Sequence, residues 1–86
     1  EFDGVPSIID FKTSSKLKKE EWIQHYFEQV TAYSLMYQDM TGTKIEQIVI
    51  IITVEGEPEP QVFIKNRSEF VKSLYNKVQE YRKVIK

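Results

Sequence analysis

The sequence predicts a mixed α/β domain, in which a small central sheet of parallel and antiparallel strands has helices packed on it. Two observations favour this fold class. Short apolar segments alternate along the chain with two longer segments of helical periodicity, and 86 residues suffice for one domain. The apolar fraction of 41% and the charged fraction of 29% are typical of a globular protein. We therefore expect residues 1–86 to form a single domain.

Charge and composition narrow the classes of function. The net charge of −1 argues against binding nucleic acid through bulk charge, so such binding would need a local basic patch. The chain has no cysteine, which excludes disulfides and thiolate metal sites and fits a cytoplasmic origin. No apolar run approaches the roughly 18 residues of a membrane helix, so we expect no membrane partner.

The first complete strand is expected from about Val5 to Thr13, after a hairpin turn at Asp3-Gly4. Asp-Gly favours a two-residue turn because such turns need a positive φ. The strand before this turn is nearly missing, so we expect either a fragment of a longer chain or a sheet that another chain completes. Asp10 and Lys12 point to one face of the strand, and Phe11 points to the other. Charges inside an apolar strand are costly unless they are paired or used.

A polar loop and a long helix follow this strand. Lysines give the loop and its surroundings a local positive charge, at Lys12, Lys16, Lys18 and Lys19. The helix is expected from residue 19 or 20 to residue 40 or 41, because Gly42 is a favoured residue just after a helix end. Two stripes at helical spacing predict that it is largely covered. They are Ile23, Phe27, Val30, Ser34 and Tyr37, and Trp22, Tyr26, Gln29, Tyr33, Met36 and Met40.

The second half of the chain predicts two strands and a closing helix. Residues 45–54 are apolar on both faces, as expected of a central strand, and residues 55–60 break this strand. Residues 61–65 are expected to return antiparallel. Asn66 and Glu69 form a capping-box pattern that starts the last helix. The residues expected to be buried on that helix are Phe70, Leu74, Val78, Tyr81 and Ile85, with Val71 and Tyr75 alongside.

Three features occur in order: the segment Ile8-Ile9-Asp10-Phe11-Lys12-Thr13-Ser14, the lysine-rich loop, and a helix with Gln29-Val30-Thr31-Ala32-Tyr33. This order resembles the PD-(D/E)XK nuclease superfamily, and within it the RecB-like exonuclease branch. Members of that branch follow I-x-D-x-K-T-S with a helix bearing Q-x-x-x-Y. The resemblance covers nearly the whole chain. It implies a restriction-endonuclease-like core without its N-terminal elements, so that residues 1–86 would be the C-terminal part of a larger nuclease domain.

The resemblance also implies a function, which is a metal-dependent DNA exonuclease of recombination, repair or phage DNA metabolism. Its setting would be the cytoplasm of a bacterium or of a phage-infected cell. Phosphodiester hydrolysis needs a nucleophilic water and charge stabilisation at phosphoryl oxygens, and Mg²⁺ or Mn²⁺ supplies both. By resemblance, Asp10 and the backbone carbonyl of Phe11 would bind the metal. Lys12 would orient or activate the water, helped by Gln29 and Tyr33. Candidate contacts to DNA phosphates are Thr13, Ser14 and Lys16.

One departure from the family pattern leaves other functions open. The superfamily has a second metal-binding carboxylate upstream, whereas Asp3 is better explained as a turn residue, so we expect the isolated chain to be a poor catalyst. One alternative is a non-catalytic binding or assembly module on the same scaffold. Another is an unrelated small α/β domain in which Asp10 and Lys12 form a structural ion pair. Because a shortened core exposes apolar surface, we expect a homodimer or a missing N-terminal segment to complete the fold.

Overall fold

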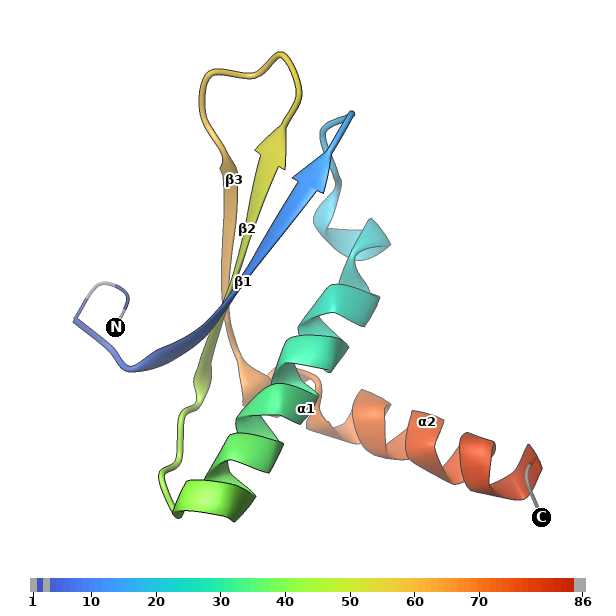
Figure 1. Ribbon diagram of the computed structural model, residues 1–86. Coiled ribbons are helices and arrows are strands. Elements are labelled where there is room, and N and C mark those ends of the chain that lie inside the picture. Colours follow the sequence, from blue (N-terminus) through green and yellow to red (C-terminus); the bar gives the residue numbers. More distant parts are fainter. Residues whose placement is uncertain (1, 3, 85–86) are drawn as a thin grey trace.

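The chain folds into a three-stranded mixed sheet with two α-helices, and the computed structural model describes residues 2 and 4–84, with side chains up to residue 81. The elements are β1 (Ser7–Ser14), the short 3-10 helix η1 (Glu20–Trp22), α1 (Gln24–Thr41), β2 (Gln47–Val54), β3 (Gln61–Asn66), the short 3-10 helix η2 (Arg67–Glu69) and α2 (Val71–Val84) (Figure 1). β2 lies between β1 and β3, parallel to β1 and antiparallel to β3. The predicted mixed fold is confirmed.

The connections follow from the strand directions. Parallel strands need a crossover of a dozen or more residues, and α1 provides it between β1 and β2. β2 and β3 are antiparallel and are joined by residues 55–60, as predicted. β2 begins at Gln47, two residues later than expected, where the carbonyl of Ile45 accepts a hydrogen bond from the Ser34 hydroxyl of α1. This polar contact ties the end of the crossover to the helix before the strand begins.

The N-terminal hairpin is present in the described residues. Phe2 and Val5 exchange two backbone hydrogen bonds of 2.8 and 3.0 Å, and Gly4 between them has a φ of 74°. A residue without a Cβ adopts this positive φ at little cost, which is why the turn sequence predicted it. Asp3, the other residue of the predicted turn, and Glu1 lie outside the described residues.

The core lies between one face of the sheet and α1. The Phe27 and Phe70 rings stack at a centroid distance of 4.9 Å and connect α1 to the start of α2. The buried apolar residues are Ile23, Phe27, Val30, Ile48, Ile50, Ile52, Val54 and Phe70. The first stripe of α1 is therefore confirmed as its core face, except that Tyr37 at its end is 42% exposed.

The long helix is interrupted near its start. The sequence predicts one helix from residue 19 or 20, whereas η1 ends at Trp22 and α1 begins at Gln24. Between them Ile23 has a φ of −116° and a ψ of 22°, outside the helical range, and is only 1% exposed. The burial of this side chain beneath the turn accompanies the break in the helix. The other end agrees with the prediction, because Gly42 has a φ of 77° and donates its N–H to the carbonyl of Gln38.

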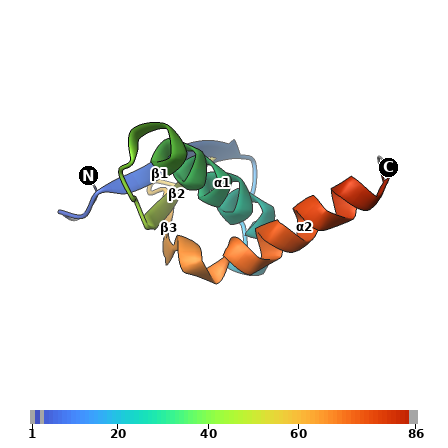
Figure 2. The ribbon, with the colours of Figure 1, turned by 90° about the horizontal axis from the view of Figure 1, so that it is seen from below.

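Two burial predictions are wrong, and both concern helix faces that no described element covers. On the second stripe of α1, Trp22 is 57% exposed and Met40 is 81% exposed. On α2, Tyr75 and Tyr81 are 61% and 65% exposed, and Ile85 lies outside the described residues. The reason is that the sheet contacts α1 on one side only, and α2 projects away from the sheet (Figures 1 and 2). The radius of gyration, 14.3 Å, accordingly exceeds the about 12 Å expected for a compact chain of this length.

The start of α2 is held by its cap. Asn66 accepts a hydrogen bond from the Ser68 N–H and donates its own N–H to Glu69, so the predicted capping box is present. The turn that it caps is η2, and α2 proper begins at Val71. Arg67 in this turn is buried and donates hydrogen bonds to Ser34 Oγ at 3.0 Å and to Gln38. These bonds fix the turn against the second half of α1.

A buried carboxylate on α1 makes the polar contact with α2. Glu28 is 4% exposed, accepts a hydrogen bond from the Ser73 hydroxyl, and forms an ion pair with Lys77 at 2.5 Å. Burial raises the pKa of Glu28, but the hydrogen bonds and the charge of Lys77 outweigh it and hold that pKa below its usual value. The ionised carboxylate therefore links the two helices. No helix among the described residues has both the length and the apolar character needed to cross a membrane.

Candidate functional site

β1 places Asp10 and Lys12 on the face of the sheet that packs against α1. In the parallel register Asp10 lies opposite Ile50 and Lys12 opposite Ile52, and both isoleucines are fully buried. Because β1 is at the edge of the sheet, its charged side chains reach the rim of the core rather than its centre. The exposed fractions of the two side chains are 23% for Asp10 and 28% for Lys12. The edge position thus explains how this strand carries charges on its inner face.

The ammonium group of Lys12 lies at the centre of the site. Its Nζ atom is 3.2 Å from Oδ2 of Asp10 and donates a hydrogen bond of 3.2 Å to Oε1 of Gln29. It also lies 4.9 Å from the centre of the Tyr26 ring, within the range of a cation–π contact. The structure therefore brings Asp10, Lys12 and Gln29 together across β1 and α1. We call these three residues, with Tyr26, the Lys12 cluster.

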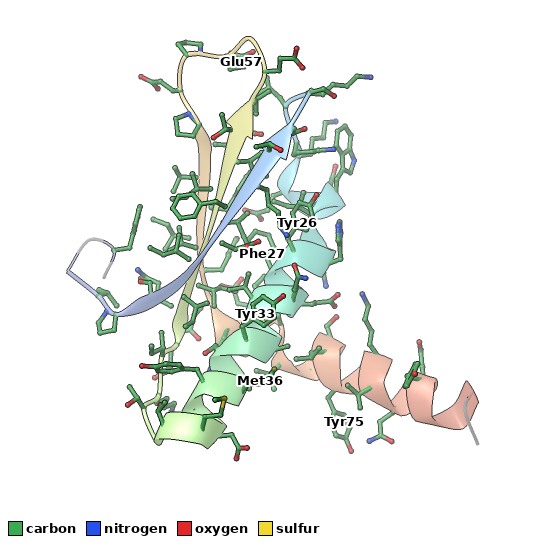
Figure 3. All side chains as sticks on the ribbon, viewed as in Figure 1. Tyr26, Phe27, Tyr33, Met36, Glu57 and Tyr75 are labelled. Carbon is green, nitrogen blue, oxygen red and sulfur yellow. The ribbon has the colours of Figure 1, made fainter. Side chains whose placement is uncertain are left out.

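Tyr26 was not predicted as a site residue. It lies in the first turns of α1, and Figure 3 shows it and Tyr33 at separate levels along the helix. The signal that could have identified it is its spacing, because Tyr26 precedes Gln29 by three residues and therefore shares a helix face with it. A cation on the inner face of β1 would then be expected to meet an aromatic ring as well as an amide.

One oxygen of Asp10 has an open acceptor position. Its Oδ2 atom is buried and has no partner with hydrogen-bond geometry in the described structure, although Lys12 Nζ lies 3.2 Å away. Lys12 thus compensates the charge of Asp10 without forming an aligned hydrogen bond to it. A buried acceptor without a donor destabilises a fold, and such atoms in native structures often bind an ion or a ligand. Asp10 therefore has an acceptor atom that the described residues leave without a hydrogen bond.

A divalent cation at Asp10 would find few protein ligands. No group of three or more His, Cys, Asp or Glu side chains in the described part of the chain could hold a metal ion. Mg²⁺ in enzyme sites often keeps several waters and binds through one or two carboxylates together with substrate phosphates. Asp10 and the carbonyl of Phe11 fit part of such a site. They would hold Mg²⁺ or Mn²⁺ weakly until a substrate supplies further oxygens.

The other predicted site residues lie outside the Lys12 cluster. Tyr33 is one helical turn beyond Gln29, is 47% exposed, and forms no hydrogen bond with the cluster in the described structure. The Phe11 side chain is 72% exposed on the opposite face of β1. Only its backbone carbonyl is therefore a candidate metal ligand. Thr13 alternates to that same outer face and is exposed. The structure therefore brings neither Tyr33 nor Thr13 into the Lys12 cluster.

Ser14 and Lys16 shape the loop that follows β1. The Ser14 hydroxyl donates a hydrogen bond of 2.6 Å to the Lys16 carbonyl and accepts one of 3.2 Å from the Lys16 N–H. A shallow polar pocket at this end of the sheet is lined by Thr13, Ser14, Ser15, Thr53 and Glu55. Its hydroxyls suit a phosphate, whereas the carboxylate of Glu55 repels one. Lys16 is exposed and directly follows the lining residue Ser15 in sequence.

Comparison with known proteins does not assign the chain to a family. No protein-family model matches it, and no match is found among curated proteins. The nuclease resemblance therefore depends on the residues and their geometry alone.

Proposed function

We propose that this chain is the core, or part of the core, of a metal-dependent DNA exonuclease of the PD-(D/E)XK type, in its RecB-like branch. The observation that carries the proposal is the contact among Asp10, Lys12 and Gln29. Lys12 and Gln29 are 17 residues apart in the chain and on different elements, yet they are joined by a hydrogen bond. If the sequence resemblance to the nucleases were accidental, it would give no reason for Lys12 to contact both Asp10 and Gln29.

The proposed reaction is hydrolysis of a phosphodiester. The oxygen of a water molecule bonds to phosphorus, the bond from phosphorus to the leaving sugar oxygen breaks, and the leaving oxygen takes up a proton. A divalent cation, when bound, would stabilise negative charge on the phosphoryl oxygens and make the water more acidic. Asp10 would bind that cation through its carboxylate, whose Oδ2 has no hydrogen-bond partner in the described structure. Lys12 would lie beside the attacked phosphate, where its positive charge opposes the charge that develops.

Gln29 and Tyr26 would act on the reaction by positioning Lys12. An ammonium group has three donors, and here the Gln29 carbonyl oxygen accepts one while the Tyr26 ring lies within cation–π range. A flexible lysine is thereby held in one place before a substrate binds. Such preorganisation reduces the entropy lost on reaching the transition state. The amide NH₂ of Gln29 remains as a donor for a phosphate oxygen or for the attacking water.

A non-catalytic DNA-binding or assembly module on the same scaffold is the second candidate. The observation that favours it is the shortage of carboxylates, because Asp10 is the one carboxylate within ion-pair distance of Lys12 in the described part of the chain. A single carboxylate seldom holds Mg²⁺ without further oxygen ligands. This candidate predicts DNA binding that is independent of metal and of Asp10.

A cleavage assay on end-labelled single- and double-stranded DNA tests the proposal, with Mg²⁺, Mn²⁺ or EDTA present. We expect slow cleavage that requires metal and that falls by about 100-fold or more in Asp10→Asn and in Lys12→Met. Asp39→Asn, which removes an exposed carboxylate at the far end of α1, is the matched control and should retain activity. Circular dichroism establishes that each variant is folded.

The outcomes separate the two candidates. Cleavage that persists in EDTA or in Asp10→Asn contradicts the nuclease proposal. DNA binding without any cleavage, unchanged by Asp10→Asn, supports the binding module instead.

A further inference from the structure

We propose that Lys19 and Trp22 form a stacking platform for an unpaired base of a DNA strand beside the Lys12 cluster. The inference rests on the nucleic-acid substrate proposed above. It adds a binding residue to that site and gives the site a preference for single strands. Trp22 lies on η1, the segment that connects the lysine-rich loop to α1 (Figure 1).

Trp22 is presented to solvent and oriented by a cation. Its side chain is 57% exposed, and Nζ of Lys19 lies 5.2 Å from the centre of its ring. A cation–π contact of this kind holds the lysine over one face of the indole, and more than half of the Trp22 side chain is open to solvent. An aromatic face next to an ammonium group is the combination that stacks a base and attracts its phosphate.

The loop that carries this platform is fixed in place. Gln61 of β3 accepts a hydrogen bond from the Lys18 N–H and donates one to the Lys18 carbonyl, both at 2.9 Å. At the other end of the loop, Ser14 forms the two hydrogen bonds with Lys16 described above. Side chains thus bond the backbone of the five-residue connection between β1 and η1 at two points. A fixed aromatic platform loses less entropy on binding than a mobile one.

The charges around the platform favour an anionic strand. Lys16 and Lys19 are exposed, and Lys18 lies between them. Of the two carboxylates that follow, Glu20 is compensated by Lys65 at 3.0 Å, and Glu21 is exposed. The segment therefore has a local excess of positive charge although the whole chain has a net charge of −1. This is the local basic patch that DNA binding requires in a protein without bulk positive charge.

The platform lies close to the proposed reaction centre. Trp22 precedes Tyr26 by four residues, and the Tyr26 ring contacts Lys12. The helix is interrupted at Ile23 between them, and four residues of chain span at most about 14 Å. A base stacked on Trp22 would therefore belong to a nucleotide near the phosphate beside Lys12.

Stacking on Trp22 requires a base with a free face. Inside a duplex both faces of every base are covered by neighbouring pairs, whereas unpaired bases stack readily on aromatic side chains. The platform therefore favours a single strand over a duplex. Because the base is recognised by its π face, we expect little dependence on base identity.

The test measures binding of a short oligothymidylate to the full chain in EDTA, so that cleavage plays no part. Trp22 is the only tryptophan, so its fluorescence reports on this position alone. We expect saturable quenching by the single strand and much weaker quenching by the same sequence in a blunt duplex. Contacts of three lysines predict a slope of about −2 for log affinity against log salt concentration.

Substitutions assign the effect to the platform, with affinity followed by anisotropy of a labelled oligonucleotide. Trp22→Ala should weaken binding roughly 5- to 150-fold, as expected for the loss of one stacked base, and Trp22→Phe should recover part of it. Tyr75→Ala is the matched control, because Tyr75 is an aromatic residue of similar exposure on α2, away from the site (Figure 3). This variant should bind as the wild type does.

Three results would overturn the inference. The first is equal affinity of the chain for single-stranded and duplex DNA, and the second is unchanged affinity for single-stranded DNA in Trp22→Ala. The third is a change in Trp22 emission with anionic lipid vesicles but not with DNA. Its failure is distinguishable from failure of the nuclease proposal. Quenching by DNA without cleavage leaves the platform standing and removes the catalytic role. Metal-dependent cleavage without quenching does the reverse.

Discussion

Removal of the Lys12 charge should destabilise the protein far more than removal of an exposed lysine. Lys12→Met keeps most of the aliphatic stem of the side chain and deletes the ammonium group. The Asp10 carboxylate, only 23% exposed and with its Oδ2 buried, is then left without a cation. Gln29 also loses the donor to its side-chain oxygen.

The magnitude follows from the burial of the pair. Breaking a fully buried ion pair costs about 3–5 kcal/mol, whereas an exposed pair contributes about 0–1 kcal/mol. With about a quarter of each side chain exposed, the Asp10–Lys12 pair falls between these limits, and we expect a loss of about 2 kcal/mol in the free energy of unfolding. For a urea m-value of about 1 kcal/mol/M, the unfolding midpoint would fall by about 2 M.

Urea denaturation of a double-mutant cycle measures the coupling directly. The cycle comprises wild type, Asp10→Asn, Lys12→Met and the double variant, and we expect a coupling energy of about 1–2 kcal/mol. The double variant should be more stable than Lys12→Met, because the charge that was left buried is gone. Lys72→Met, at an exposed position on α2, is the control and should change stability by less than about 0.5 kcal/mol.

A coupling energy near zero would refute the reasoning. It would mean that the two side chains do not compensate each other on the inner face of β1. The Lys12 cluster, and the function proposed for it, would then have no energetic support.

Three further predictions concern the scaffold. Because folding lowers the pKa of Glu28 below its usual 4.5, ionised Glu28 stabilises the fold above pH 4.5, and this stabilisation is lost as the pH falls through the lower folded-state pKa. Urea unfolding at several pH values should show this loss in wild type but not in Glu28→Gln. Ile50→Ala, at a fully buried position of β2, should lower the free energy of unfolding by about 2–5 kcal/mol, measured by the same denaturation. Gly42→Ala should lower it by about 1 kcal/mol, because its φ of 77° is unfavourable for alanine, and equal stability would contradict that reason.

Residue periodicity predicted much of the scaffold and part of the site. The apolar run of β2 identified the central strand, and the spacing of Ile23, Phe27 and Val30 identified the core face of α1. The role of Gln29 came from the nuclease resemblance, whereas alternation along β1 placed Asp10 and Lys12 on one face. These features depend on local backbone geometry, which repeats every two residues in a strand and every 3.6 in a helix.

The sequence predicted that the second stripe of α1 and the apolar stripe of α2 are buried, and both predictions are wrong for the same physical reason. Four residues have the spacing of buried residues, yet they are exposed because no element in the described part of the chain lies against them: Trp22, Met40, Tyr75 and Tyr81. Periodicity says which residues share a face, but it does not say whether a second element covers that face. The break at Ile23, a buried residue outside the helical range of φ and ψ, has no counterpart in the periodicity.

By itself, the sequence determined which residues alternate, which stripes are apolar and where turns and caps occur, since each of these depends on neighbours along the chain. Only the tertiary structure decided that Lys12 meets Gln29 and the Tyr26 ring, and that a buried Asp10 oxygen is left open. It also decided that Gln61 fixes the loop that presents Trp22. Such contacts join residues from different elements, and their geometry depends on how β1, β3 and α1 pack rather than on any local pattern.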